Sequence, residues 1–153
     1  MLAANEPVHF PLIELTEWVF VGEQAFTAIT EDLARAALAL PEGQIDQNRE
    51  RDFVDSQGWR IRINGHRVVR TKRSILSWFG SPVFLEVIFD FVNTGQYVPL
   101  DALKQEVLIR VPELIELAED GRMTTTEFIR LIESAEDHAE LIRHATFQTP
   151  GSN

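Results

Sequence analysis

The chain has 153 residues, no cysteine and a formal net charge of −10 at pH 7. That length suits a single domain with a hydrophobic core, and the absence of cysteine excludes disulfides, thiolate metal sites and cysteine nucleophiles. No stretch of 18 residues is apolar and free of charge, and the first residues lack a basic region followed by an apolar one. We therefore expect a cytoplasmic protein with no signal peptide and no membrane partner.

The charge is spread unevenly along the chain. Residues 1–48 carry one base against eight acids, residues 49–73 carry eight bases against three acids, and residues 101–140 carry four bases against eleven acids. The simplest interpretation is that acidic segments of the same fold, or of a second copy, neutralise the basic segment. Binding of the basic segment to nucleic acid is the alternative, and repulsion between phosphates and the rest of the chain opposes it.

The first third of the chain predicts helices and one short strand. The apolar positions of residues 7–21 fit a helix as well as a strand, and we favour a helix. Thr30 followed by two acids is typical of a helix cap and predicts a helix over residues 32–40. Residues 41–51 are polar and rich in turn formers, so they predict a linker, and residues 52–55 predict a short strand.

Residues 59–72 predict the central β-structure, because Asn64-Gly65 between two alternating runs is a strong signal for a two-residue hairpin turn. Such a turn places Arg62 directly opposite Arg67, and like charges in that position are unfavourable without a negative partner. Alternation also sorts the side chains into two faces. The face assigned to the core holds Trp59, Ile61, Ile63, His66 and Val68, and the other face holds Arg60, Arg62, Arg67 and Val69.

Residues 74–95 predict two further helices. Residues 74–80 fit a short one, and Ser81-Pro82 supplies a serine cap and a proline at the first helical position for the next. This second helix runs over residues 82–93 and is apolar on nearly every side. Such a helix lies at the centre of a core or in an interface.

The rest of the chain predicts two longer helices and a tail. The first begins at Asp101, and Pro112 kinks it or divides it in two. The second begins at the capping box Thr124-x-x-Glu127 and continues nearly to residues 146–153, which we expect to form a flexible tail. The predicted fold is therefore α+β: a mostly helical single domain over residues 1–145, with a central antiparallel β-hairpin or short meander.

The segment from Glu116 to Glu127 resembles the calcium loop of the EF-hand family. With Gly121 at the sixth position of the loop, Asp120 falls at the fifth and Glu127 at the twelfth. The resemblance implies a calcium site, but Glu116 replaces the first aspartate and Ala118 offers no oxygen at the third position. Calcium takes about six to eight oxygen ligands, so we interpret the segment as a joint between two helices.

A second resemblance is to the BTB/POZ interaction family. It rests on the spacing between His66 and Ser74 and on the run Phe-Asp-Phe-Val-Asn-Thr-Gly at residues 89–95, which looks like the end of a helix in that family. The chain departs from the family at Arg70 and Asn93, where the family has leucine and tyrosine. The resemblance implies an oligomerising adaptor.

The sequence carries no catalytic signature. Its histidines form no His-x-x-x-His pair, its serines lie in no Gly-x-Ser-x-Gly turn, and its scattered glycines form no phosphate loop. Glu136, Glu140 and His144 share a helical stripe that could hold a divalent metal, but such stripes are usually solvated. Glu86 and Asp90 could form an acid/base pair, but they more simply meet arginines. We expect no enzyme, no cofactor and no metal.

We expect a non-catalytic protein–protein interaction or assembly module, acting as an adaptor or a structural component of a larger complex, that forms a homo-oligomer. Two alternatives stay open: an acidic inhibitor of the immunity-protein type that covers a basic partner, and nucleic-acid binding through the basic hairpin. The expected partner-binding residues are the basic Arg60, Arg62, Arg67 and Arg70 and the acidic Glu113, Glu116, Glu119 and Asp120.

Overall fold

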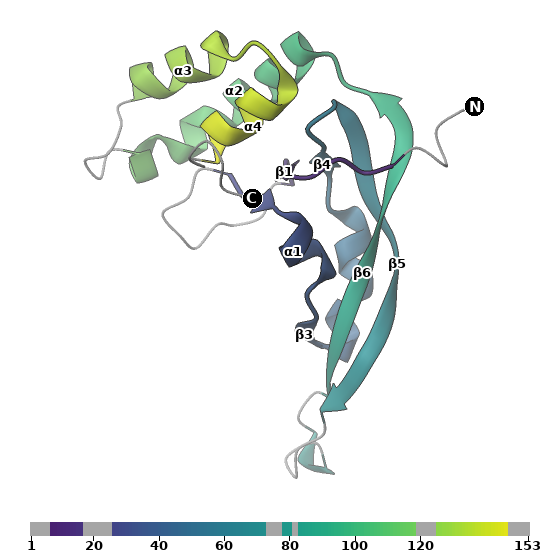
Figure 1. Cartoon of the computed structure of the whole chain (residues 1–153). Helices are drawn as coiled ribbons and strands as arrows, with labels where there is room; N and C mark the ends of the chain where they lie inside the picture. Colours follow the sequence, from purple (N-terminus) through teal and green to yellow (C-terminus); the bar gives the residue numbers. More distant parts are fainter. Residues whose placement is uncertain (1–6, 17–25, 73–77, 81–82, 119–124, 147–153) are drawn as a thin grey trace.

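The protein is built on a six-stranded antiparallel sheet that curls into a half-barrel, with a helical layer at one end (Figure 1). The computed structural model describes residues 7–16, 26–72, 78–80, 83–118 and 125–146. The strands, in the spatial order β2-β1-β4-β5-β6-β3, are β1 Leu12–Glu14, β2 Ala28–Ile29, β3 Leu38–Pro41, β4 Phe53–Val54, β5 Trp59–Lys72 and β6 Phe84–Tyr97. The helices are α1 Glu31–Arg35, α2 Leu100–Ala118, α3 Thr125–Ser134 and α4 His138–Ala145, with two 3₁₀ helices, η2 Glu42–Gln44 and η3 Asp46–Glu50.

The sheet separates two hydrophobic cores, because neighbouring residues of a strand point to opposite faces. Ile13 of β1 and Val54 of β4 belong to the core beneath α2, α3 and α4, whereas Leu12 and Phe53 belong to a second core inside the curled sheet. The first core also contains Leu103, Val107, Phe128, Ile132, Leu141 and Ile142, and the second also contains Ile45, Ile61, Ile63, Val87 and Phe89.

The helical layer consists of α2, α3 and α4, and α3 and α4 run in roughly opposite directions (Figure 1). Helix α2 continues past Pro112 as one element of 19 residues. Helix α4 begins after Asp137, whose side chain accepts a hydrogen bond from the Glu140 N–H at 2.7 Å, as a good cap does. The single last helix predicted from the sequence is therefore two helices, α3 and α4, joined at residues 135–137.

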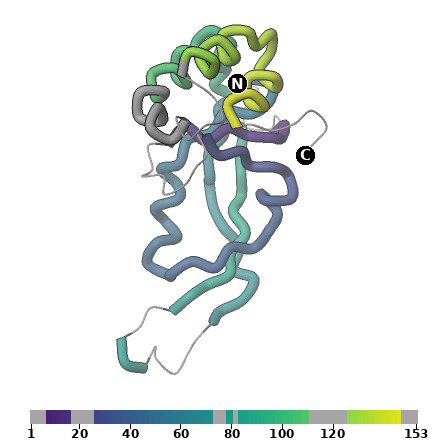
Figure 2. Tube along the Cα trace, turned by 90° about the vertical axis from the view of Figure 1, so that its left-hand side faces the viewer, coloured from purple at the N-terminus to yellow at the C-terminus, as the bar shows by residue number. Residues whose placement is uncertain are grey.

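The longest feature of the fold is the ribbon formed by β5 and β6, each of which has 14 residues. Their pairing shifts register at three places, between Trp59 and Ile61, between Ile63 and Gly65, and between Val68 and Arg70. Irregularities of this kind increase the twist of a ribbon. Its outer end and the described tip, residues 78–80, extend past the other elements, opposite the helical layer (Figures 1 and 2).

The prediction of a mostly helical domain is wrong, because several expected helices are strands. Residues 7–21 contain β1, and the helix expected over residues 32–40 ends at Arg35 and is followed by β3. A strand buried on both faces shows no alternation of polar and apolar residues, which is why β1 resembled a helix. The strand expected at residues 52–55 is confirmed as β4, and the helix expected from Asp101 is confirmed as α2.

The apolar helix expected over residues 82–93 is also wrong, since this stretch forms most of β6. Its residues Val87, Ile88 and Phe89 are β-branched or aromatic, a composition that suits strands. A short apolar run does not by itself distinguish a buried strand from a buried helix. Pairing with β5 along one edge and with β3 along part of the other decides in favour of the strand.

The hairpin turn predicted at Asn64-Gly65 does not exist. Both residues lie inside β5, where Ile63 pairs with Phe91 and Gly65 pairs with Asp90. Asn64 is therefore the extra residue of a bulge, and Gly65 lacks the positive φ that a type I′ turn requires. Arg62 does not face Arg67, because Arg62 lies opposite Val92 and Arg67 opposite Ile88.

Some predictions fall outside the described residues. These are most of the short helix at residues 74–80, the capping residue Thr124, and residues 147–153 of the expected tail. Thr146, the first residue of that tail, is buried and donates a hydrogen bond from its hydroxyl to the Ile142 carbonyl at 2.6 Å.

Candidate functional site: the basic face of the ribbon

Four basic residues of β5 form an exposed row, which we call the basic face. Cross-strand partners point to the same side of a sheet, so the register places this row on one face together with alternate residues of β6. The basic face consists of Arg62, Arg67, Arg70 and Lys72, all exposed. The residues of β6 directly opposite them are Val92, Ile88, Glu86 and Phe84, in the same order.

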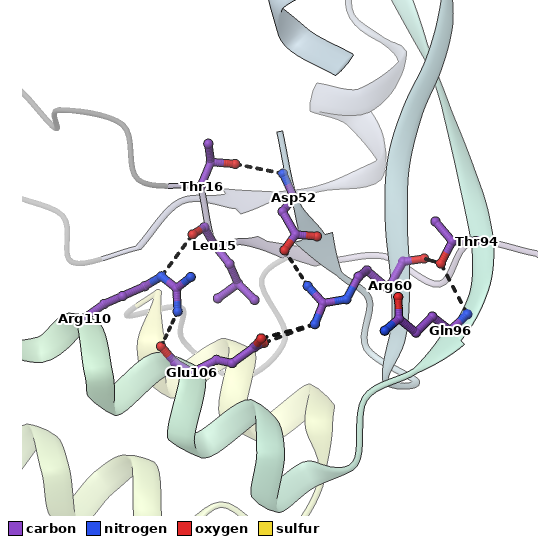
Figure 3. Close-up of polar contacts among 8 residues, drawn as sticks. All are labelled: Leu15, Thr16, Asp52, Arg60, Thr94, Gln96, Glu106 and Arg110. Atoms are coloured by element: carbon purple, nitrogen blue, oxygen red, sulfur yellow. Dashed lines mark hydrogen bonds and ion pairs between the residues drawn. The ribbon is translucent and has the colours of Figure 1, made fainter. Parts of the chain in front are cut away.

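Arg60, which precedes this row, forms its ion pairs with residues of the same chain (Figure 3). Its side chain is only 13% exposed, and it forms ion pairs with Asp52, just before β4, and with Glu106 of α2. The pair with Glu106 joins Nη2 to Oε1 at 3.2 Å. Arg60 therefore connects the sheet to the helical layer, and the cations available to a partner begin at Arg62.

Arg110 of α2 strengthens the same connection (Figure 3). Its Nε donates a hydrogen bond to the Leu15 carbonyl at 3.0 Å, and its Nη1 donates to the Glu106 carbonyl at 2.5 Å. The backbone N–H of Asp52 donates to Thr16 Oγ1 at 2.8 Å. The root of the ribbon is thus fixed to α2 by charged groups that are largely removed from solvent.

Glu86 neutralises part of the basic face. Lys72 Nζ lies 2.9 Å from Glu86 Oε1, and Arg70 lies opposite Glu86 in the register. The hydrogen bond from Lys72 lowers the pKa of Glu86, desolvation opposes that shift, and the charges of Lys72 and Arg70 add to the lowering. Asp90 of β6, opposite Gly65, is a second acid on this face. Arg62 and Arg67 form no ion pair with any residue in the described part of the chain, so the four cations outnumber the two carboxylates.

The described tip of the ribbon exposes two aromatic side chains. Trp78 is 89% exposed and Phe79 is 82% exposed, and a Cβ atom added at the neighbouring Gly80 would meet no atom within 4 Å. Exposed apolar groups that lie together commonly mark a binding surface. The sequence favours Trp78 as a core or interface anchor and does not mark Phe79, although the turn formers Gly80 and Pro82 that follow them place both at a loop tip.

The predicted acidic residues are only partly placed. Glu113 and Glu116 lie in α2, where the side chains beyond Arg110 are not described. Glu119 and Asp120 lie outside the described residues altogether, as does half of the loop that resembles an EF-hand. The described helical layer exposes other acids at the joint between α3 and α4. These are Glu133, Glu136 and Asp137.

The two histidines of α4 have structural contacts. His138 is buried, and its Nε2 lies 2.7 Å from the Val98 carbonyl, to which it donates a hydrogen bond. His144 Nδ1 lies 3.0 Å from the Leu131 carbonyl, and its Nε2 lies 3.6 Å from Glu140. Among the described residues, no group of three or more histidine, aspartate or glutamate side chains is arranged to hold a metal ion.

In the ranges that the structure covers, no helix combines the length and the apolar character needed to cross a membrane. Comparisons of the chain with protein-family models, with curated proteins and with solved structures found no match. The geometry and charge of the ribbon are therefore the features that point to a function.

Proposed function

We propose that the protein is a non-catalytic assembly module that self-associates through the ribbon. The observation that carries the proposal is the basic face, where Arg62 and Arg67 are exposed and without a counter-ion among the described residues. The chain as a whole has a net charge of −10. Opposite charge for these arginines is therefore abundant on a second copy, and complementary charge favours rapid, oriented association.

Nucleic acid fits the basic face less well. Binding to nucleic acid depends on several cations that contact phosphates at once. Here Glu86 lies among the cations and already holds Lys72, and the acidic remainder of the chain repels phosphates. On the basic face, Arg62 and Arg67 lie beside the apolar Val92 and Ile88 of β6. A protein surface that offers a few carboxylates beside apolar groups would complement this arrangement.

Light scattering on a sizing column tests this proposal. We expect an oligomer of defined mass at about 0.1 M salt that dissociates toward about 1 M, because the Debye length falls from about 10 Å to about 3 Å over that range. The double variant Arg62→Glu/Arg67→Glu should elute as a monomer at the lower salt. The matched control is Arg35→Glu/Arg49→Glu, which changes the net charge equally at exposed sites outside β5 and β6 and should keep the oligomer.

Two results would overturn the proposal. One is a wild-type protein that stays monomeric at both salt concentrations over the accessible concentration range. The other is an oligomer that both double variants leave unchanged. Absorbance at 260 nm that co-elutes with the wild type and disappears with Arg62→Glu/Arg67→Glu would assign the basic face to nucleic acid instead.

A further inference from the structure

We infer that the ribbon of one copy docks on the α3–α4 end of a second copy, and that the second ribbon docks on the first copy in the same way. This inference rests on the proposed self-association and names the two surfaces that meet. Because each copy offers both surfaces, an antiparallel pair satisfies both contacts within a closed two-fold dimer.

The outer part of the ribbon lies away from the helical layer of its own chain, whereas the root of the ribbon contacts that layer through Arg60 and Tyr97. The outer end of β5 and the tip at residues 78–80 lie at one end of the molecule, and α3 and α4 lie at the other end, in both views (Figures 1 and 2). The root of the ribbon is held in place by the ion pairs of Arg60 with Asp52 and Glu106. A contact between the outer part of the basic face, from Arg67 onward, and the α3–α4 end would therefore join two copies.

The charges of the two surfaces are complementary. Residues 125–146 carry five acids against two arginines, and the exposed Glu133, Glu136 and Asp137 follow one another at the α3–α4 joint. On the ribbon, Arg62 and Arg67 form no ion pair among the described residues, although Asp90 of β6 lies on the same face. Opposite charges attract one another within a Debye length of about 10 Å, so these two surfaces would attract each other when two copies meet.

The size of the ribbon and its tip also suit this contact. The stretch His66–Lys72 spans about 20 Å at the usual rise of a strand, which is enough to cross two neighbouring helices of about 10 Å diameter each. Its tip then carries Trp78 and Phe79 past the far helix of the partner. Exposed tryptophan beside arginine is the composition that most often dominates binding energy at protein interfaces.

Direct pairing of two β5 edges is a less favourable way to join copies. Beyond Ile61, β5 pairs only with β6 among the described strands, so no described strand pairs with its other edge. Antiparallel addition of a second β5 would place one row of arginines beside another, and cations on an edge strand oppose such pairing. The acidic helices of the second copy avoid that repulsion.

An exchange of charges between copies tests the contact. The ribbon variant is Arg67→Glu/Arg70→Glu, within the stretch that crosses the partner's helices, and the helix variant is Glu133→Lys/Glu136→Lys, all at exposed positions. Each variant alone should be monomeric, because its ribbon and its helical end then carry the same sign of charge. Mixing the two in equal amounts should restore a dimer, because each ribbon then meets helices of the opposite sign. Light scattering of the two proteins alone and of the mixture measures this directly.

The aromatic tip provides a second, independent measurement. Trp78→Ala/Phe79→Ala should raise the dimer dissociation constant by about tenfold or more, as loss of a central aromatic anchor does. The control Leu33→Ala removes an exposed apolar side chain of α1, which is 54% exposed, and should leave the constant unchanged. Circular dichroism should give the same spectrum for every variant, because all of these side chains are exposed.

The possible failures are distinguishable. A monomeric wild-type protein overturns the proposed self-association itself. A dimeric wild type, with a mixture of ribbon and helix variants that stays monomeric, keeps self-association and overturns the ribbon-to-helix contact. A tip variant that dimerises as well as the Leu33→Ala control overturns the anchoring role of Trp78 and Phe79.

Discussion

Gly58 shows how one residue without a side chain joins the sheet to the helical layer. Its carbonyl accepts a hydrogen bond from the Val98 N–H at 2.7 Å, and the Val98 carbonyl accepts one from His138 of α4. Its φ is +92°, and a Cβ atom at this position would lie 2.6 Å from His138 Nε2 and 2.8 Å from Tyr97 Cε1. Any side chain at residue 58 would therefore combine backbone strain with a collision.

The first prediction concerns this position. Gly58→Ala should reduce the free energy of unfolding by about 3 kcal/mol, from about 1–2 kcal/mol of left-handed strain and a similar cost of overpacking. Gly80 has the same φ but open space around it, so Gly80→Ala should reduce the free energy of unfolding only by the left-handed strain. Gly43→Ala has neither problem and should be nearly neutral. Urea unfolding of the three variants checks this order; equal losses for Gly58→Ala and Gly80→Ala would mean that the collision is absent.

Arg60 and Arg62 are two residues apart and have opposite roles. Arg60 is largely buried between Asp52 and Glu106, whereas Arg62 is exposed. Arg60→Leu should cost about 3 kcal/mol of unfolding free energy, because it leaves two carboxylates near the interior without their cation. Arg62→Leu should change stability by no more than about 0.5 kcal/mol. Chemical denaturation of both variants measures the difference, and similar small losses would contradict the buried role of Arg60.

At the scale of the element, the central question is whether β5 is one strand or a hairpin. In the structure Arg67 lies opposite Ile88 of β6, and no turn separates Arg62 from Arg67. Because the chain contains no cysteine, introduced cysteines can report the pairing without background. Cross-strand neighbours have Cα atoms about 4.5–5.5 Å apart, within the range of a disulfide.

The third prediction follows from that register. Arg67→Cys/Ile88→Cys should form an intramolecular disulfide under mild oxidation, detected by mass spectrometry of tryptic peptides. Arg62→Cys/Arg67→Cys should keep two free thiols within each chain, because five residues of one strand separate the Cα atoms by about 15 Å. A disulfide in the Arg62→Cys/Arg67→Cys variant, with free thiols in the Arg67→Cys/Ile88→Cys variant, would support the hairpin turn at Asn64-Gly65 and contradict the pairing of β5 with β6.

At the scale of the whole molecule, two cores share one sheet. Phe53 and Val54 are neighbours in β4, yet Phe53 belongs to the core inside the curled sheet and Val54 to the core beneath the helices. Loss of packing in either core therefore disturbs the same strands. Physical coupling of this kind makes unfolding cooperative, so the described ranges are expected to unfold as one unit.

The fourth prediction tests this coupling. Phe53→Ala should cost about 3–5 kcal/mol and Leu141→Ala about 2–5 kcal/mol, since both side chains are fully buried. In each variant, loss of helix followed in the far ultraviolet and loss of aromatic packing followed in the near ultraviolet should give one coincident transition. Two separate transitions would show that the helical layer and the curled sheet are independent domains.

The surface that carries the proposed function could be predicted in part from the sequence. Alternation about a two-residue turn predicts that Arg62 and Arg67 share one face of the sheet, and in the structure they do. The cause is different, because the bulge at Asn64 shifts the alternation of side chains by one residue and so has the same effect as the predicted turn. The same alternation did not reveal that Arg60 is buried, because its partner Glu106 is 46 residues away. The turn formers Gly80 and Pro82 place Trp78 and Phe79 at a loop tip, but no local pattern shows that this loop ends a long ribbon.

The sequence by itself determined the distribution of charge, the exclusion of cysteine chemistry, the short strand β4 and the start of α2, because each depends on composition or on neighbouring residues. Only the tertiary structure decided between turn and bulge at Asn64-Gly65, and between helix and strand for residues 84–93. Both local patterns fit either outcome. The decision came from hydrogen-bonded partners distant in sequence, β5 and β3 on either side of β6, whose contribution no local pattern contains.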